Sequence, residues 1–93
     1  MKTTKVKGED YGRVFLYTLS TCIWCKKTKE FLKESNVEFE YCDVDLLDEK
    51  DQELVSREID KLNPGGGYPT IIINNNDILS GFQPEKISDI LGL

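Results

Sequence analysis

The chain has 93 residues, which is enough for one small domain with a modest core. Its apolar content of 39% and charged content of 31% are typical of a globular protein and exclude a disordered or membrane-embedded one. No apolar run approaches the roughly 20 residues that cross a bilayer. The net charge of −5 argues against nucleic acid as the main partner. We therefore expect neither a nucleic-acid nor a membrane partner. We also expect a monomer.

The first 12 residues, MKTTKVKGEDYG, are charged and have no apolar stretch, so they do not predict a signal peptide. The simplest location is therefore the cytoplasm. We expect residues 1–12 to be an N-terminal tail or a short edge segment, and residues 13–93 to be the folded domain.

The first predicted elements are a strand and a helix. Residues 14–17 are continuously apolar, which favours a strand covered on both faces. Thr21 is a plausible N-cap for a helix over residues 22–35. Asn36 is a plausible terminator, because asparagine tolerates a left-handed backbone. The side chains spaced to face the core are Cys25, Thr28, Phe31, Leu32 and Ser35.

The rest of the chain alternates between strands and helices. We predict a strand over 39–44 parallel to the first, a helix over 48–62, and strands at 70–73 and 78–79 that form an antiparallel hairpin. A last helix should have Pro84 in its first turn and end at Gly92. The inward side chains of these two helices are predicted to be Leu54, Val55, Ile59, Leu62, Ile87, Ile90 and Leu91.

Two of the three cysteines lie close together in the stretch TCIWCKKTKEFL, which begins at Thr21. An odd number of cysteines excludes a fully paired disulfide framework. A close pair in a cytosolic chain is more often a redox or metal site than a structural disulfide. The chain has no histidine, which excludes every Cys/His zinc site and every histidine-dependent catalytic triad.

A metal site is the main alternative for this pair. A structural zinc site needs four protein ligands. The only other cysteine, Cys42, is better explained as a small core side chain of the second strand. We therefore predict no metal ligand and no cofactor, while an iron–sulfur cluster shared between two chains stays open as an alternative.

The position of the pair favours redox chemistry. Residues three apart on a helix lie on one side, so the sulfurs of Cys22 and Cys25 can approach disulfide distance. Cys22 is expected at the helix N-terminus, where unpaired N–H groups and the helix dipole stabilise a thiolate. Lys26 would add positive potential. Cys25 faces the core and is expected to be the slower, resolving thiol.

A CxxC at the first strand-to-helix turn of this element order resembles the thioredoxin fold, from Val14 nearly to the end of the chain. The resemblance implies an α/β domain with a four-stranded mixed sheet flanked by three helices. It also implies a cis Tyr68–Pro69 bond facing the cysteines, with the backbone at Tyr68 pairing with an extended substrate. The three glycines before Tyr68 either allow that substrate to approach closely or form a flexible connector.

Within this superfamily the chain resembles the glutaredoxin branch. Members that bind glutathione commonly carry CPYC, a basic residue three positions before the first cysteine, and TVP at the cis-proline. This chain has CIWC, Leu19 and GYP at those places. The SGFQP segment from Ser80 to Pro84 is similar to that of NrdH-type redoxins, which take electrons from a reductase and reduce protein disulfides, notably that of ribonucleotide reductase.

The resemblance therefore implies a dithiol carrier that reduces disulfide-containing proteins and is reduced by a flavin- or ferredoxin-dependent reductase of the thioredoxin-reductase type. A glutathione-dependent glutaredoxin is the alternative. Trp24 and Tyr68 offer apolar area that suits a protein surface. The residues expected to contact the substrate are Ile23, Trp24, Tyr68, Pro69, Gly81 and Phe82.

Overall fold

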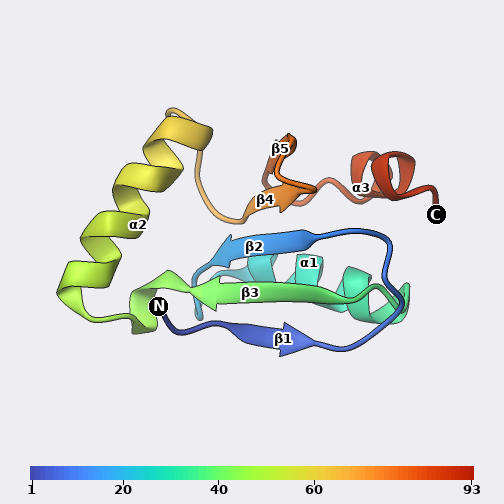
Figure 1. The fold of residues 1–93 in the computed structure, drawn as a ribbon, viewed down its shortest axis with the longest axis horizontal. Helices are drawn as coiled ribbons and strands as arrows, with labels where there is room; N and C mark the ends of the chain where they lie inside the picture. The colour runs from blue at the N-terminus through green and yellow to red at the C-terminus, as the bar shows by residue number, and fades with distance from the viewer.

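The computed structural model describes residues 1–93 and contains a five-stranded mixed sheet with the order β1-β3-β2-β4-β5 (Figure 1). The strands are β1 (Thr4–Val6), β2 (Val14–Thr18), β3 (Phe39–Asp43), β4 (Thr70–Ile73) and β5 (Asp77–Ser80). The helices are α1 (Ile23–Glu34), the 3-10 turn η1 (Val44–Leu46), α2 (Glu49–Leu62) and α3 (Pro84–Leu91). The parallel pairing of β2 with β3 and the antiparallel β4–β5 hairpin confirm the predicted α/β topology.

The sheet separates two cores, one on each face. The core on the side of α1 and α3 contains Val14, Leu16, Leu32, Val37, Phe39, Ile71, Ile73, Ile87 and Leu91. The core on the side of α2 contains Phe15, Tyr17, Cys42, Val44, Leu47, Val55 and Ile59. Successive strand side chains point to opposite faces, so a strand between two cores must be apolar throughout. This explains the continuous VFLY run of β2, and it confirms Cys42 as a core side chain.

The sheet has five strands rather than the predicted four. The additional strand, β1, lies within the segment expected to be a tail or a short edge segment, and it pairs antiparallel with β3 at the edge of the sheet. Thr3 Oγ1 donates a hydrogen bond to Glu40 at 2.5 Å, and Lys5 Nζ lies 3.9 Å from the Glu38 carboxylate. A strand of three residues with mostly exposed side chains has no apolar alternation, so no pattern in the sequence predicts it.

The ends of the helices largely match the predictions. Asn36 adopts the predicted left-handed backbone, with φ of 55°. Gly92 ends α3 as predicted, with φ of 74°, and Pro84 lies in the first turn of that helix. The predicted N-cap Thr21 is wrong. The N-cap of α1 is Cys22, because the Cys22 sulfur, and not the Thr21 hydroxyl, accepts a hydrogen bond from the Cys25 amide in the first turn.

Two predicted core residues of α2 and α3 are wrong. Leu54 is 54% exposed and Ile90 is 36% exposed. Each precedes a buried residue, Val55 or Leu91, by one position, which turns it about 100° around the helix axis and away from the core. The buried stripes of these helices are therefore narrower than the apolar sequence suggests.

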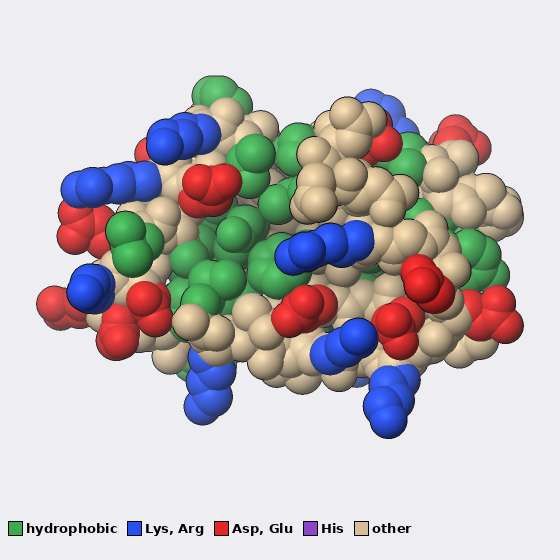
Figure 2. All heavy atoms as spheres, in the orientation of Figure 1, with side chains coloured by type: hydrophobic (Ala, Val, Ile, Leu, Met, Phe, Trp, Pro, Cys, Tyr) green, Lys and Arg blue, Asp and Glu red, His purple; other side chains and the backbone are tan.

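Apolar side chains reach the surface on the α2 side of the sheet (Figure 2). No helix is both long and apolar enough to pass through a lipid bilayer. Figure 2 shows hydrophobic side chains gathered between α2 and the sheet, with charged side chains around them. A groove of about 340 Å³ lies on this side, and its apolar lining includes Phe15, Tyr17, Leu62, Ile72 and Ile78. The α2 face of the sheet is thus only partly covered.

Candidate active site

Cys22 lies where the loop after β2 enters α1. Because β2 and β3 run parallel, their carboxyl ends meet at the same edge of the sheet, and α1 starts there. Cys22 has an extended backbone (φ −83°, ψ 120°), and its sulfur accepts a hydrogen bond from the amide of Cys25 at 3.2 Å. An N-cap side chain meets unpaired N–H groups and the positive end of the helix dipole. The predicted place of Cys22 at the helix N-terminus is confirmed.

Cys25 lies one helical turn further on, on the buried face of α1. Its exposed fraction is 0%, whereas Cys22 is partly exposed, and both are free thiols. Burial raises the pKa of the Cys25 thiol to about 12, and a hydrogen bond with Cys22 adds to the rise. The nearby charge of Lys29 acts in the opposite direction. One helical turn therefore holds one accessible thiol and one thiol kept protonated in the core.

The loop before β4 faces Cys22. The Tyr68–Pro69 peptide bond is cis, as the resemblance implied. The Tyr68 carbonyl oxygen lies 4.0 Å from Cys22 Sγ, the distance of a weak hydrogen bond from the thiol. The Pro69 carbonyl accepts the amide of Gly81 at 2.9 Å, which joins this loop to the segment after β5. The structure thus brings together Tyr68, Pro69 and Gly81, three of the residues predicted to contact the substrate, and places the Tyr68 carbonyl beside Cys22.

Three rings form an aromatic cluster (Trp24, Phe31, Phe82) beside the cysteines. Trp24 stacks on Phe82 with ring centroids 6.2 Å apart, and Phe82 meets Phe31 edge-on at 6.4 Å. Trp24 is 52% exposed and Ile23 is 59% exposed. Lys27 Nζ lies 5.0 Å from the centre of the Trp24 ring. Exposed large apolar side chains gathered at one place are typical of a contact surface.

The lysines after Cys25 occupy different surroundings. Lys26, predicted to tune the cysteines, is exposed. Lys29 is largely buried, with Nζ 3.1 Å from Asp43 Oδ1 and 3.8 Å from the centre of the Tyr41 ring. Lys29 was missed from sequence, although its position four residues after Cys25 places both side chains on one face of the helix.

A polar contact fixes the loop that leads to Cys22. Asp45 in η1 accepts hydrogen bonds from both the hydroxyl and the amide of Ser20, the latter at 2.8 Å. These hydrogen bonds lower the pKa of the Asp45 carboxyl. Gln52 Nε2 donates to the carbonyls of Asp45 and Leu47, which ties η1 to α2. The loop is thereby anchored to an element 25 residues away, and no local pattern predicts this contact.

The Glutaredoxin family model matches residues 14–78, a range that includes both cysteines and the cis-proline. The chain belongs to the glutaredoxin family. The glutaredoxin of Methanosarcina mazei Go1 is 41% identical, with a TM-score of 0.89 over 100% of this chain and 90% of that one. A glutaredoxin-like 8.6 kDa protein in the rubredoxin operon of Clostridium pasteurianum is 39% identical over 77 residues, which are 82% of this chain and 93% of that protein.

A more distant structural neighbour is the NrdH-redoxin of Escherichia coli, a glutaredoxin-like protein with a thioredoxin-like activity profile. It is 27% identical, with a TM-score of 0.62 over 83% of this chain and 92% of that one. The glutaredoxin fold and the cysteine pair together indicate thiol–disulfide oxidoreductase activity.

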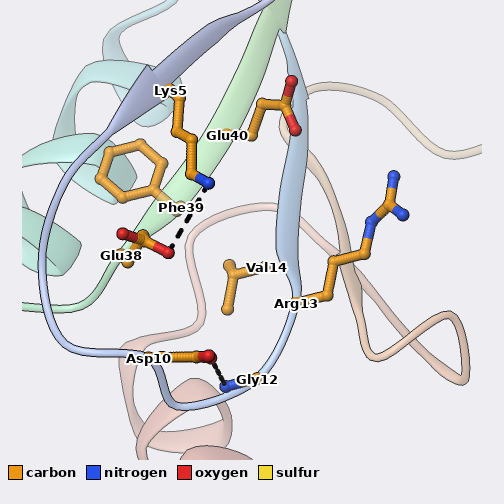
Figure 3. A pocket seen from close by; sticks show the side chains of 8 residues that line it. All are labelled: Lys5, Asp10, Gly12, Arg13, Val14, Glu38, Phe39 and Glu40. Carbon is orange, nitrogen blue, oxygen red and sulfur yellow. Dashed lines mark hydrogen bonds and ion pairs between the residues drawn. The ribbon is translucent and has the colours of Figure 1, made fainter.

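The largest cavity of this glutaredoxin lies away from the cysteine pair. No three His, Cys, Asp or Glu side chains come together in a way that suits a metal ion. The largest cavity, about 480 Å³, is shown in Figure 3 and lies beside the first residues of β2, at the opposite end of that strand from Cys22. Its lining residues are Lys5, Asp10, Gly12, Arg13, Val14, Glu38, Phe39 and Glu40. It contains no thiol, so the redox chemistry belongs to the other end of the sheet.

Proposed function

We propose that this glutaredoxin is a dithiol–disulfide electron carrier that reduces the disulfides of other proteins, in the manner of NrdH-type redoxins. The observation that carries the proposal is the unequal burial of two thiols in one helical turn, with the accessible one beside an exposed apolar surface. Cys22 is the attacking thiol and Cys25 is the resolving thiol. Such a division of roles needs one sulfur that a large substrate can reach and one that it cannot.

The reaction has two steps. The Cys22 thiolate attacks one sulfur of the substrate disulfide, the substrate S–S bond breaks, and the other substrate sulfur leaves as a thiolate that takes up a proton. Cys25 then loses its proton and attacks the Cys22 sulfur. The Cys22–Cys25 disulfide forms, and the second substrate sulfur leaves as a thiol. Two electrons have then passed to the substrate, and a flavin- or ferredoxin-dependent reductase must return two electrons to the pair.

The surroundings of Cys22 support a protein substrate over glutathione. Leu19, at the place where the glutathione-binding members carry a basic residue, packs partly buried against the core on the α2 side. A carboxylate of glutathione therefore finds no cation there. The exposed Ile23 and Trp24 instead offer apolar area of the kind that protein interfaces use.

The segment from Ser80 to Pro84, which resembles that of NrdH-type redoxins, connects the loop before β4 to α1 at this surface. The Gly81 amide donates a hydrogen bond to the Pro69 carbonyl, and the Phe82 ring stacks on the Trp24 ring. Gly81 has φ of 83°, a left-handed conformation that favours glycine. The segment thus holds together the two parts of the docking surface, one from the loop before β4 and one from α1. We further propose that the protein acts as a monomer in the cytoplasm, where a reducing environment keeps its buried cysteines as thiols.

The test is to reduce insulin disulfides with three electron sources in parallel. These are NADPH with a flavin-dependent thioredoxin reductase, reduced ferredoxin with a ferredoxin-dependent reductase, and glutathione with glutathione reductase. We expect turnover with one of the two reductases and only background with glutathione. The Cys42→Ala variant is the matched control, because Cys42 lies in the core and should not affect turnover. Rapid turnover with glutathione would overturn the proposal in favour of a glutathione-dependent glutaredoxin. If a reductase supports turnover, ribonucleotide reductase is the first natural substrate to add.

A further inference from the structure

The three-glycine loop between α2 and β4 is folded around one side chain, that of Asn63. Asn63 is the C-cap of α2, and its Nδ2 donates a hydrogen bond to Thr70 Oγ1 at 3.1 Å. The Thr70 hydroxyl donates in turn to the Gly67 carbonyl at 3.0 Å. The Gly66 amide donates to the Asn63 carbonyl at 3.0 Å. The loop is therefore closed by side-chain and backbone hydrogen bonds.

The glycines themselves show how tightly the loop fits this amide. A Cβ at Gly66 would lie 2.0 Å from Asn63 Nδ2, which no real Cβ tolerates without movement. A Cβ at Gly67 would meet nothing within 4 Å. Thr70 has an exposed fraction of 0%, so water cannot replace the partners of its hydroxyl. The position of the Gly67 carbonyl thus depends on the Asn63–Thr70 pair.

The chain leads from this anchored carbonyl directly to the residue that faces the reactive sulfur. Tyr68 follows Gly67, and its own carbonyl lies 4.0 Å from Cys22 Sγ. On the far side, the Pro69 carbonyl is held by the amide of Gly81. The backbone around Tyr68 is therefore held on both sides. On one side the donor is the Thr70 hydroxyl, which itself accepts a hydrogen bond from Asn63.

We propose that Asn63 is a positioning residue for substrate binding: through Thr70 it holds the Gly67–Tyr68 backbone in the conformation that an extended substrate segment docks against. This inference rests on the proposed function, because the docking segment is that of a protein disulfide. Asn63 touches neither cysteine in this arrangement. It should therefore affect how a protein binds and not how Cys22 reacts.

The first test is the Asn63→Asp variant, which keeps the shape and removes the Nδ2 donor. The Thr70 hydroxyl has one proton, so it can then donate a hydrogen bond either to the new carboxylate or to the Gly67 carbonyl, but not fully to both. Losing one buried hydrogen bond predicts a KM for insulin disulfides raised about fivefold, with kcat little changed. The rate with the small disulfide DTNB and the rate of Cys22 alkylation should both stay within about twofold of the wild type, because neither needs strand docking.

The second test uses the space around Gly66 and guards against loss of the fold. Gly66→Ala should lower the melting temperature and raise the KM for insulin, whereas Gly67→Ala should leave the melting temperature unchanged. In the Asn63→Ala background the amide is gone, so Gly66→Ala should cause no further fall in melting temperature.

The outcomes separate this inference from the proposed function. A folded Asn63→Asp protein with an unchanged KM for insulin overturns the positioning role. Equal losses with insulin and with DTNB also overturn it, since they would indicate a general structural effect. A wild-type protein that fails to reduce insulin with any reductase is instead a failure of the proposed function.

Discussion

Cys22 and Cys25 belong to the same helical turn but lie in opposite surroundings. Cys22 caps the helix at the surface, between the Tyr68 carbonyl and the exposed end of α1. Cys25 is completely buried, and its burial raises the pKa of its thiol to about 12. In the proposed reaction, one of these sulfurs therefore meets the substrate and the other acts only after the first has reacted.

The difference extends along the two faces of α1. The inner face carries Cys25, Thr28 and Leu32, all fully buried, while the outer face carries the exposed Ile23 and Trp24. Stability should depend on the first set and recognition of a partner on the second. The predictions below test this division in order of the expected size of the effect.

The largest effect is expected from replacing each cysteine separately. Cys22→Ser removes the nucleophile and should lower the turnover of insulin disulfides by more than about a thousandfold. Cys25→Ser should also stop turnover but leave the first step intact, so a stable mixed disulfide between Cys22 and the substrate should accumulate. Non-reducing gels and mass spectrometry detect it. A mixed disulfide through residue 25 in the Cys22→Ser protein would reverse the two roles.

The next effect separates the two faces of α1. Leu32→Ala leaves a cavity in a fully buried position and should lower the free energy of unfolding by about 3 kcal/mol. Trp24→Ala removes a ring that is 52% exposed and should lower it by less than about 1 kcal/mol. The order should reverse in the insulin assay, where Trp24→Ala raises KM about tenfold. Urea unfolding and steady-state kinetics measure the two quantities, and a Trp24 variant with normal KM would remove the ring from the docking surface.

The smallest effect is the dependence of stability on pH. The folded state holds the Cys25 proton more tightly than the unfolded chain, in which the thiol has its ordinary pKa of about 9. The stabilisation is therefore complete below pH 9 and is lost as the pH rises from about 9 towards 12. Between pH 8 and pH 10, the reduced protein should lose about 1 kcal/mol more stability than the Cys25→Ser variant does. If the free energy of unfolding of the two proteins falls equally between pH 8 and pH 10, burial does not raise the pKa of the Cys25 thiol.

The predictable parts of the structure are those with a local pattern. The CxxC spacing placed Cys22 and Cys25 correctly, and the VFLY run predicted a strand covered on both faces. The cis Tyr68–Pro69 bond came from resemblance and not from any physical pattern in the sequence. In contrast, the bond from Ser20 to Asp45 and the ion pair between Lys29 and Asp43 join polar residues far apart in the chain. Such contacts depend on which strands become neighbours and have no periodic signal.

The glycine loop is the most instructive of these cases. Three consecutive glycines predict a turn, but they do not distinguish a flexible connector from a loop folded around Asn63. The position of the Asn63 amide beside Gly66 and Thr70 follows from the tertiary structure and has no signal in the sequence.

The most direct test of the division between the two thiols is alkylation of the fully reduced protein with limiting iodoacetamide at pH 7.5, followed by peptide mapping of all three cysteines. Cys22 should be modified first and nearly alone, while Cys25 and the buried Cys42 should react only after denaturation. Modification of Cys25 at a rate equal to or above that of Cys22 in the folded protein would contradict the assignment of Cys22 as the nucleophile.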